Sequence, residues 1–207
     1  MTNPVIRIVD DDPQVAESLR FYLEVSGFQV LAYESGEAFL LNDDRSRVGC
    51  LLLDVRMPTM SGLELQRVLN AEHAMLPIVF LSAHADVSMA VDAVRQGASG
   101  FVEKPPKPEV LLSELKKAVA LHEKRVKMQR EIDEIDAQLA KLTPAEEETA
   151  KLIAKGLSNA EIAEIMNLAE STVRRRRADI ASKLDTQNAV EVSELYRWKM
   201  QLKEELP

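Results

Sequence analysis

The sequence is poor in the residues that mark several classes of protein. It contains one cysteine, Cys50, so it can form neither an internal disulfide nor a thiolate metal cluster, which suits a reducing compartment. It has only 7 glycines and 9 prolines among 207 residues, and 46% of its residues are hydrophobic. This composition excludes collagen-like, low-complexity and disordered chains. We expect a globular chain with one large domain or two small ones.

Long hydrophobic runs are missing as well. The longest near-apolar stretches, such as residues 77–83, fall far short of the roughly 18 residues that a membrane-spanning helix needs. The first residues, Met1-Thr-Asn-Pro, lack the basic and apolar regions of a secretion signal. We therefore expect no membrane partner, no export and a cytoplasmic location.

The net charge of −8 argues against a chain that binds nucleic acid along its whole length. Residues 1–121 hold most of the acid excess, with 17 acidic and 11 basic side chains, whereas residues 143–207 carry 12 and 10. Within the second of these segments, residues 174–177 are four consecutive arginines. The local potential there can oppose the net charge, so this run needs an explanation of its own.

The first 120 residues alternate short apolar runs with amphipathic helical patterns. Between the first two runs, for example, Val15, Leu19 and Leu23 recur at helical spacing. Strict alternation of this kind predicts an α/β fold, a doubly wound five-stranded parallel sheet with its functional residues at the carboxyl ends of the strands. The predicted strands are residues 5–9, 28–32, 50–53, 77–81 and 100–102.

The last third of the chain reads as an all-α domain of four helices. Thr143 and Ser158 each stand three residues before a glutamate, which is the pattern of a capping box at the start of a helix. A short helix to about Met166, a tight turn and a new helix from Ser171 predict a helix-turn-helix. A fourth helix is expected over residues 188–199.

A regular apolar stripe precedes this domain. Residues 109–141 contain no glycine or proline. Six apolar residues in the later part of this stretch and directly after it follow heptad spacing: Leu121, Met128, Ile132, Ile135, Leu139 and Leu142. The helix can lie on one of its own domains, or it can continue from the first domain into a short parallel coiled coil. We favour the second interpretation, with domains at 1–120 and 143–207, a helical linker at 121–142, and a homodimer held through Met128, Ile132, Ile135 and Leu139.

Acidic residues gather at the predicted strand ends. Asp10, Asp11 and Asp12 follow the first strand directly, and Asp54 ends the third. Because the ends of these strands lie side by side, at least three carboxylates converge, and crowded carboxylates repel one another unless a cation is present. Mg²⁺ is the expected cation, since it prefers oxygen ligands. Lys104, after the fifth strand, strengthens the case for a site.

Two enzyme-like alternatives fit this region poorly. A phosphatase with an aspartate nucleophile needs a second acid two residues later, and position 56 is an arginine, which has no usable proton to give. A flavodoxin-like redox module needs a phosphate-binding loop rich in Ser, Thr or Gly after the first strand, where this chain has three aspartates. We therefore expect no enzyme beyond a self-limiting hydrolase.

Residues 1 to about 120 resemble the receiver domain of bacterial two-component response regulators. The resemblance lies in Asp10-Asp11, Asp54 within residues 53–58, Ser82, Phe101 and Lys104-Pro105. It implies that Asp54 accepts a phosphoryl group from a sensor histidine kinase, with Ser82 and Phe101 as switch residues. It also implies a typically cis Lys104-Pro105 bond and Mg²⁺ held by Asp10, Asp11, Asp54 and the backbone carbonyl of Arg56. Asp12 then reads as a helix N-cap or bystander.

The arginine run fits a recognition helix. Val173, Ile180 and Leu184 share one face at i, i+7 and i+11, while Arg174 and Arg175 project from other faces. An arginine run on a helix is often only a solvated surface. After a capped helix and a tight turn, it indicates a helix whose first residues enter the major groove of double-stranded DNA.

Residues 142–184 also resemble the LuxR-type DNA-binding domain, through residues 156–159, 161–163, 171–173 and 183–184. Together with the receiver, this resemblance implies the FixJ/NarL-like class of response regulator, with RNA polymerase as a further partner. The family often has arginine where Ala145 and Glu147 stand and histidine where Arg176 stands. The implied DNA contacts are Arg174, Arg175, Ala178, Ser171, Thr172, Asn159 and Lys183.

We therefore expect a transcriptional regulator that depends on phosphorylation. The alternative keeps the receiver and makes the helical domain a module for interaction with another protein.

Overall fold

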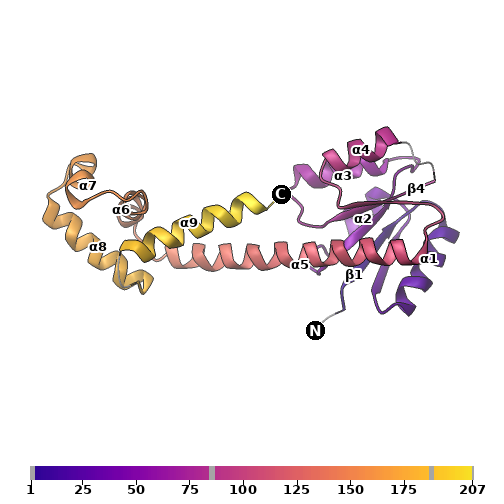
Figure 1. The fold of residues 1–207 in the computed structure, drawn as a ribbon, viewed down its shortest axis with the longest axis horizontal. Helices are drawn as coiled ribbons and strands as arrows, with labels where there is room; N and C mark the ends of the chain where they lie inside the picture. The colour runs from indigo at the N-terminus through magenta and orange to yellow at the C-terminus, as the bar shows by residue number, and fades with distance from the viewer. Residues whose placement is uncertain (1–2, 84–86, 187–188, 207) are drawn as a thin grey trace. The chain divides into compact units, whose positions relative to one another are not determined.

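The computed structural model describes residues 3–83, 87–186 and 189–206. The chain divides into two compact units, residues 1–126 and residues 127–206. The first is an α/β unit and the second is all-helical, which confirms the predicted fold class (Figure 1). Among the described residues, no helix combines the length and apolarity that crossing a membrane requires.

The first unit is built on a five-stranded parallel sheet with the order β2-β1-β3-β4-β5. Each predicted strand is confirmed within one residue at either end. Strands β1, β3 and β4 are buried throughout, because helices cover both faces of the sheet (Figure 1). The strands are β1 (Val5–Val9), β2 (Gln29–Tyr33), β3 (Gly49–Asp54), β4 (Ile78–Ser82) and β5 (Gly100–Glu103).

Successive side chains of a strand point to opposite faces, so the sheet separates two apolar cores. On one face, Ile6, Ile8 and Leu52 pack with α1 and the start of α5. On the other face, Leu51 and Leu53 pack with α2, α3 and α4. The helices of the unit are α1 (Pro13–Val25), α2 (Gly36–Asn42), α3 (Gly62–Ala71), α4 (Val87–Arg95) and α5 (Pro108–Leu139), the last of which continues into the second unit.

The second unit contains the four predicted helices. Both capping boxes are present, with the Thr143 and Ser158 side chains accepting from the backbone N–H of Glu146 and Glu161. Asn167 ends the first helix of the helix-turn-helix in the left-handed region, at φ 52°. The helices are α6 (Pro144–Ala154), α7 (Asn159–Met166), α8 (Glu170–Leu184) and α9 (Ala189–Glu205). Residue 188, where the fourth helix was expected to start, lies outside the described residues.

The apolar stripe on α5 is buried within its own chain, so the expectation of a free dimerisation seam is wrong. Met128, Ile132, Ile135 and Leu139 join the same core as Ile153 of α6 and Leu202 of α9. Helix α9 lies against this part of α5, where Lys199 pairs with Asp136 (Figure 1). The four buried side chains, with their exposed fractions, are Met128 (6%), Ile132 (2%), Ile135 (6%) and Leu139 (8%).

Residues 121–142 consequently do not form a linker separate from both units. His122 is buried in the first unit, where its Nδ1 lies 3.0 Å from the backbone N of Gly49. From residue 127 onward α5 belongs to the second unit. The interpretation in which the amphipathic helix lies on its own domain is the correct one for this stripe.

Ile132→Ala should therefore destabilise the second unit rather than dissociate a dimer. Losing a buried isoleucine side chain leaves a cavity and should lower the free energy of unfolding by about 2–5 kcal/mol. Trp198 on α9 is the one tryptophan of the chain, so its fluorescence during urea unfolding follows this unit. The exposed neighbour Glu134→Ala is the control. An equal midpoint for Ile132→Ala and wild type would contradict the packing described here.

Candidate functional site

Sheet register brings the strand-end carboxylates together. Val9 of β1 pairs with Leu53 of β3, so the next residues, Asp10 and Asp54, are neighbours at the carboxyl edge of the sheet. Both are buried, whereas Asp11 is exposed. One carboxylate oxygen from each of these three aspartates lies within 4.8 Å of those of the other two. The convergence predicted for the strand ends is confirmed.

Lys104 joins two of these carboxylates. Its Nζ lies 2.7 Å from Asp10 Oδ2 and 3.1 Å from Asp54 Oδ2. Its backbone N–H donates to the carbonyl of Ser82 at 2.7 Å, which fixes the start of the lysine side chain beside β4. The Lys104-Pro105 peptide bond is cis, as the receiver resemblance implies.

The charges in the site act on one another. Burial raises the pKa of Asp54, and the nearby Asp10 charge adds to this effect, while Lys104 counteracts it. Burial alone would lower the pKa of Lys104, yet its hydrogen bonds and its attraction to the two carboxylates leave that pKa raised. The ammonium group thus stays charged and compensates part of the negative charge of the cluster.

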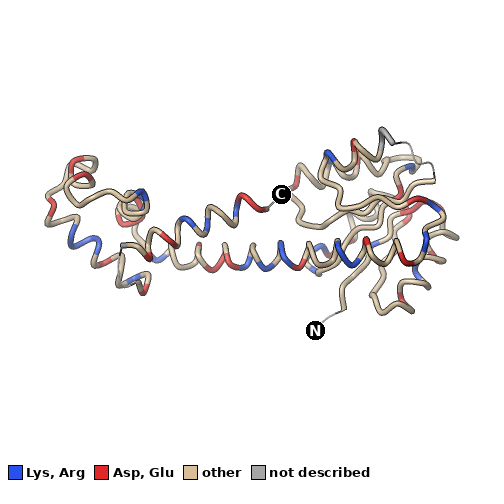
Figure 2. Tube along the Cα trace, viewed as in Figure 1, with Lys and Arg blue, Asp and Glu red and all other residues tan. Residues whose placement is uncertain are grey.

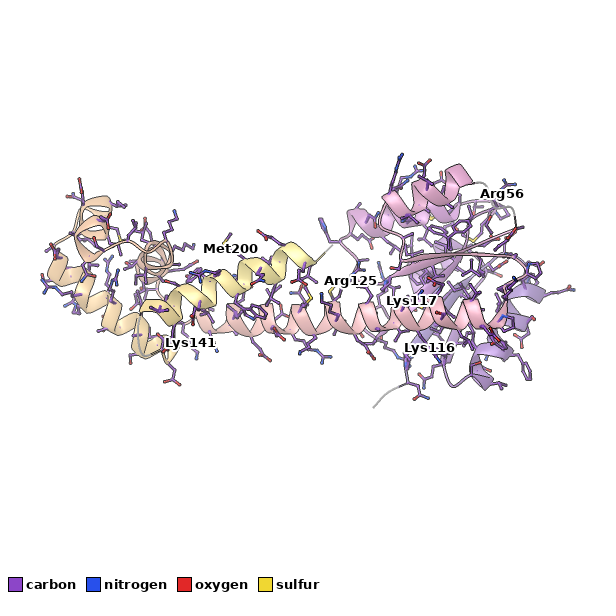
Figure 3. The ribbon with its side chains drawn as sticks, in the orientation of Figure 1. Arg56, Lys116, Lys117, Arg125, Lys141 and Met200 are labelled. Carbon is purple, nitrogen blue, oxygen red and sulfur yellow. The ribbon has the colours of Figure 1, made fainter. Side chains whose placement is uncertain are left out.

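The donor set fits a magnesium ion. Asp10, Asp11 and Asp54 offer hard carboxylate oxygens that are close enough together to share one small cation. The backbone N of Arg56 lies 3.5 Å from Asp54 Oδ1, so the Arg56 peptide borders the same cluster. The Arg56 side chain is exposed in the loop after β3 (Figure 3). The backbone carbonyl of Arg56 remains a predicted ligand.

Asp12 has a structural role. Its Oδ1 accepts from the backbone N–H groups of Gln14 and Val15, at 2.9 and 3.3 Å, and caps α1. Of the two roles left open for Asp12, N-cap or bystander, the structure shows the N-cap, and this aspartate stands outside the cluster that could hold a metal.

The two predicted switch residues lie on neighbouring strands. Ser82 ends β4 and is 3% exposed. Phe101 lies on the edge strand β5, opposite Phe80 of β4 in the strand register, and is partly buried against the core on that face of the sheet. A hydroxyl and an aromatic ring therefore lie on the two strands that follow β3 in the sheet.

Sequence reasoning missed the part that Gly62 plays in this site. A Cβ added at Gly62 would lie 2.3 Å from the carbonyl oxygen of Asp54 and 3.0 Å from the Phe80 ring. Only glycine lets α3 approach the backbone of Asp54 this closely. The available signal was a glycine at the first position of a capped helix, eight residues after Asp54.

In the second unit, α8 presents the basic run. Val173, Ile180 and Leu184 are buried, as predicted. Arg174 and Arg175 are exposed on the same helix, where Figure 2 shows the basic residues in the middle of α8. The other predicted DNA contacts at the start and middle of α8 are accessible to different degrees, with Ser171 and Ala178 exposed and Thr172 partly buried.

Two basic side chains of α8 are engaged within the protein. Arg177 donates to the carbonyl of Leu157 at 2.6 Å and so ties α8 to the turn before α7. Lys183 Nζ lies 2.6 and 2.8 Å from the two carboxylate oxygens of Glu146. Asn159 is partly buried, and its Oδ1 has no hydrogen-bond partner among the described residues. Contact of Lys183 or Asn159 with DNA stays a prediction.

Models of two protein families match the chain. Residues 6–116 match the response regulator receiver domain. Residues 140–196 match the bacterial regulatory proteins of the luxR family.

Curated relatives and solved structures agree with these matches. The response regulator protein TmoT of Ectopseudomonas mendocina is 36% identical over 98% of this chain and 90% of its own length. The transcriptional regulatory protein FixJ of Bradyrhizobium diazoefficiens is 33% identical over 94% of both proteins. The structure of the response regulator StyR has a TM-score of 0.78 at 35% identity, covering 95% of this chain and 99% of that one.

A receiver fold with an acidic cluster, followed by a LuxR-type helix-turn-helix, defines a two-domain DNA-binding regulator. The chain belongs to the family of transcriptional response regulators. The predicted family and the predicted combination of domains are both confirmed.

The Glu146–Lys183 pair should make the second unit sensitive to acid. Hydrogen bonds from Lys183 and from Thr143 lower the pKa of Glu146 to about 2. A carboxyl group with a depressed pKa contributes stability that is present above its unfolded value, near 4.5, and is lost as the pH falls toward 2. Urea midpoints followed by Trp198 fluorescence should fall less steeply over this window in Glu146→Gln than in wild type. If the urea midpoints of wild type and Glu146→Gln fall equally steeply with pH, the Glu146 carboxylate is not the source of the acid sensitivity.

Proposed function

We propose that a sensor histidine kinase phosphorylates Asp54 and that the chain then controls transcription by binding double-stranded DNA through α8. The observation that carries the proposal is the Lys104 ammonium group between Asp10 and Asp54, in the same chain as the exposed arginines of α8. The first arrangement suits the transfer of a phosphoryl group to a carboxylate. The second suits contact with a polyanion.

In the transfer step, a carboxylate oxygen of Asp54 attacks the phosphorus atom of a phosphohistidine. The P–N bond breaks, the imidazole of the kinase leaves, and Asp54 becomes an acyl phosphate. Lys104 offsets negative charge on the transferring oxygens. Asp10, Asp11, Asp54 and the carbonyl of Arg56 would hold Mg²⁺, which supplies further compensation of that charge.

The kinase has a surface on which to dock beside the site. A groove of about 670 Å³ lies between α1 and the segment that leads into α5, with Lys104 in its wall. Val15, Leu19 and Tyr22 of α1 line the groove, as does Pro105. A partner helix seated there would hold its histidine close to Asp54.

The added phosphoryl charge gives the receiver a way to change. A phosphoryl group on Asp54 offers acceptor oxygens that draw the Ser82 hydroxyl inward. Phe101 then follows into the vacated space, and the surface around β4 and β5 rearranges.

The receiver also offers a surface for a homodimer, in place of the stripe that proves to be buried. Val91 and Val94 on α4 are 42% and 56% exposed, and Val110 at the start of α5 is 46% exposed. These helices flank the edge strand β5 in the chain. We propose that this face pairs two phosphorylated copies, so that two α8 helices engage two DNA half-sites. RNA polymerase is the expected partner of the bound dimer.

Asp54→Asn should abolish labelling of the protein by acetyl phosphate in Mg²⁺, because the nucleophile is lost while the shape of the side chain is kept. Asp11→Asn should reduce labelling through weaker metal binding, and the capping change Asp12→Asn should leave it nearly unchanged. Phosphate incorporation, measured by intact mass, distinguishes these results. Labelling of Asp54→Asn at the wild-type level would place the phosphoacceptor elsewhere.

Arg174→Ala and Arg175→Ala should weaken DNA binding without unfolding the second unit, since both side chains are exposed. Loss of a base contact should weaken the free energy of binding by about 1–3 kcal/mol and relax specificity at one base pair. Loss of a phosphate contact should reduce the slope of log affinity against log salt concentration by about one. Fluorescence anisotropy with selected and random duplexes measures both effects. Lys203→Ala on α9 removes the same charge as a control.

The same titration tests the alternative in which the helical unit binds another protein. A DNA-binding domain must show affinity that falls steeply with salt. Absence of salt-dependent binding by the phosphorylated wild type would favour the protein-interaction alternative.

A further inference from the structure

A second cavity lies at the opposite end of the sheet from Asp54. It has a volume of about 350 Å³ and is lined by the end of α3, the start of β4, the end of α4 and Arg125 of α5. This volume falls within the range of small-molecule pockets in proteins. All of these parts belong to the first unit.

Arg125 is the unusual member of this cavity (Figure 3). Its side chain is partly buried, and its one recorded bond runs from Nη1 to the carbonyl of Met75 at 3.0 Å. No carboxylate pairs with it anywhere in the described parts of the chain. Burial lowers the pKa of Arg125 and no acidic neighbour counteracts the effect. A partly buried guanidinium that has five N–H donors and uses one of them can accept an anionic partner.

The remaining walls define what kind of anion fits. Arg95, in the last turn of α4, adds a second guanidinium, and His73 adds an imidazole. Leu76 and Ile78 provide apolar surface, and no aspartate or glutamate is among the described residues that line the cavity. A guanidinium binds a carboxylate through two parallel hydrogen bonds, and the apolar walls suit a hydrocarbon group attached to it.

We propose that this cavity binds the carboxylate group of a small organic acid, with Arg125 as the main partner and Arg95 as the second. The bound acid would connect α5 to the end of α4. The site is distinct from the aspartate cluster, and its occupancy does not require phosphorylation.

The test uses the unphosphorylated full-length protein, labelled with ¹⁵N, and benzoate as the probe. Benzoate should shift the backbone amide signals of cavity residues such as Gln96 and Gly97. Benzamide has the same shape without the charge and should bind at least roughly tenfold more weakly. Equal affinities for the two probes, or no shift at the cavity with benzoate, would overturn the proposal.

Substitutions test which side chains bind the carboxylate of benzoate. Arg125→Gln should weaken benzoate binding by roughly tenfold or more, and Arg95→Gln by a smaller factor. Lys116→Gln, on the same helix and outside the cavity (Figure 3), should bind like wild type. If Arg125→Gln does not fold, Arg125→Lys tests the same point, because lysine keeps the charge and loses the planar pair of donors. Unchanged affinity in the folded Arg125 variant would overturn the assignment.

Inorganic phosphate supplies the last comparison. It carries charge without a hydrocarbon group, so it should bind more weakly than benzoate at the same ionic strength. Tighter binding of phosphate would show a simple anion site and would reject the organic acid as the ligand class.

Discussion

The ion pairs of Lys104 with Asp10 and Asp54 are the interactions on which the receiver site depends. Two buried carboxylates on adjacent strands would repel each other strongly without a nearby cation. Lys104 arrives from the far edge of the sheet, after β5, and so connects β1, β3 and β5 at their carboxyl ends. One lysine charge compensates only part of the charge of the three carboxylates, so the cluster can still attract a divalent cation.

Much of this arrangement could be predicted from the sequence because it follows from local rules. The short apolar run at residues 50–53 predicts a buried strand because it stands in a regular alternation with helical patterns, and Asp54 then stands at its carboxyl end. Asp12 stands directly before a proline that takes the first helical position, and this pattern marks the capped start of a helix. Gly62 was not assigned a role, since its importance comes from a helix that approaches the Asp54 backbone, and no spacing in the sequence records that approach.

The apolar stripe of α5 shows the limit of periodicity. The spacing of 4, 3 and 4 between Met128, Ile132, Ile135 and Leu139 predicts that one face of the helix is buried. It does not identify the surface against which that face packs. A second copy of the helix and the α9 helix of the same chain satisfy the pattern equally well. In the structure, α9 covers the stripe. It extends to Glu205 rather than ending near Lys199, and so it brings Leu202 into the shared core. The longer helix supplies the apolar surface that a coiled-coil partner was expected to supply.

The distribution of ion pairs explains how a chain with a net charge of −8 can still present a surface for DNA. In the second unit, Lys151, Lys183 and Lys199 are each paired with a carboxylate, so a DNA phosphate would have to compete for them. On α8, the nearest carboxylate recorded for Arg174 is Glu170 at 3.9 Å, and both side chains are mostly exposed. A pair of this kind contributes little and is readily exchanged. Arg174 and Arg175 therefore remain exposed and available on α8, and their contacts with DNA phosphates should contribute to the release of counterions on binding.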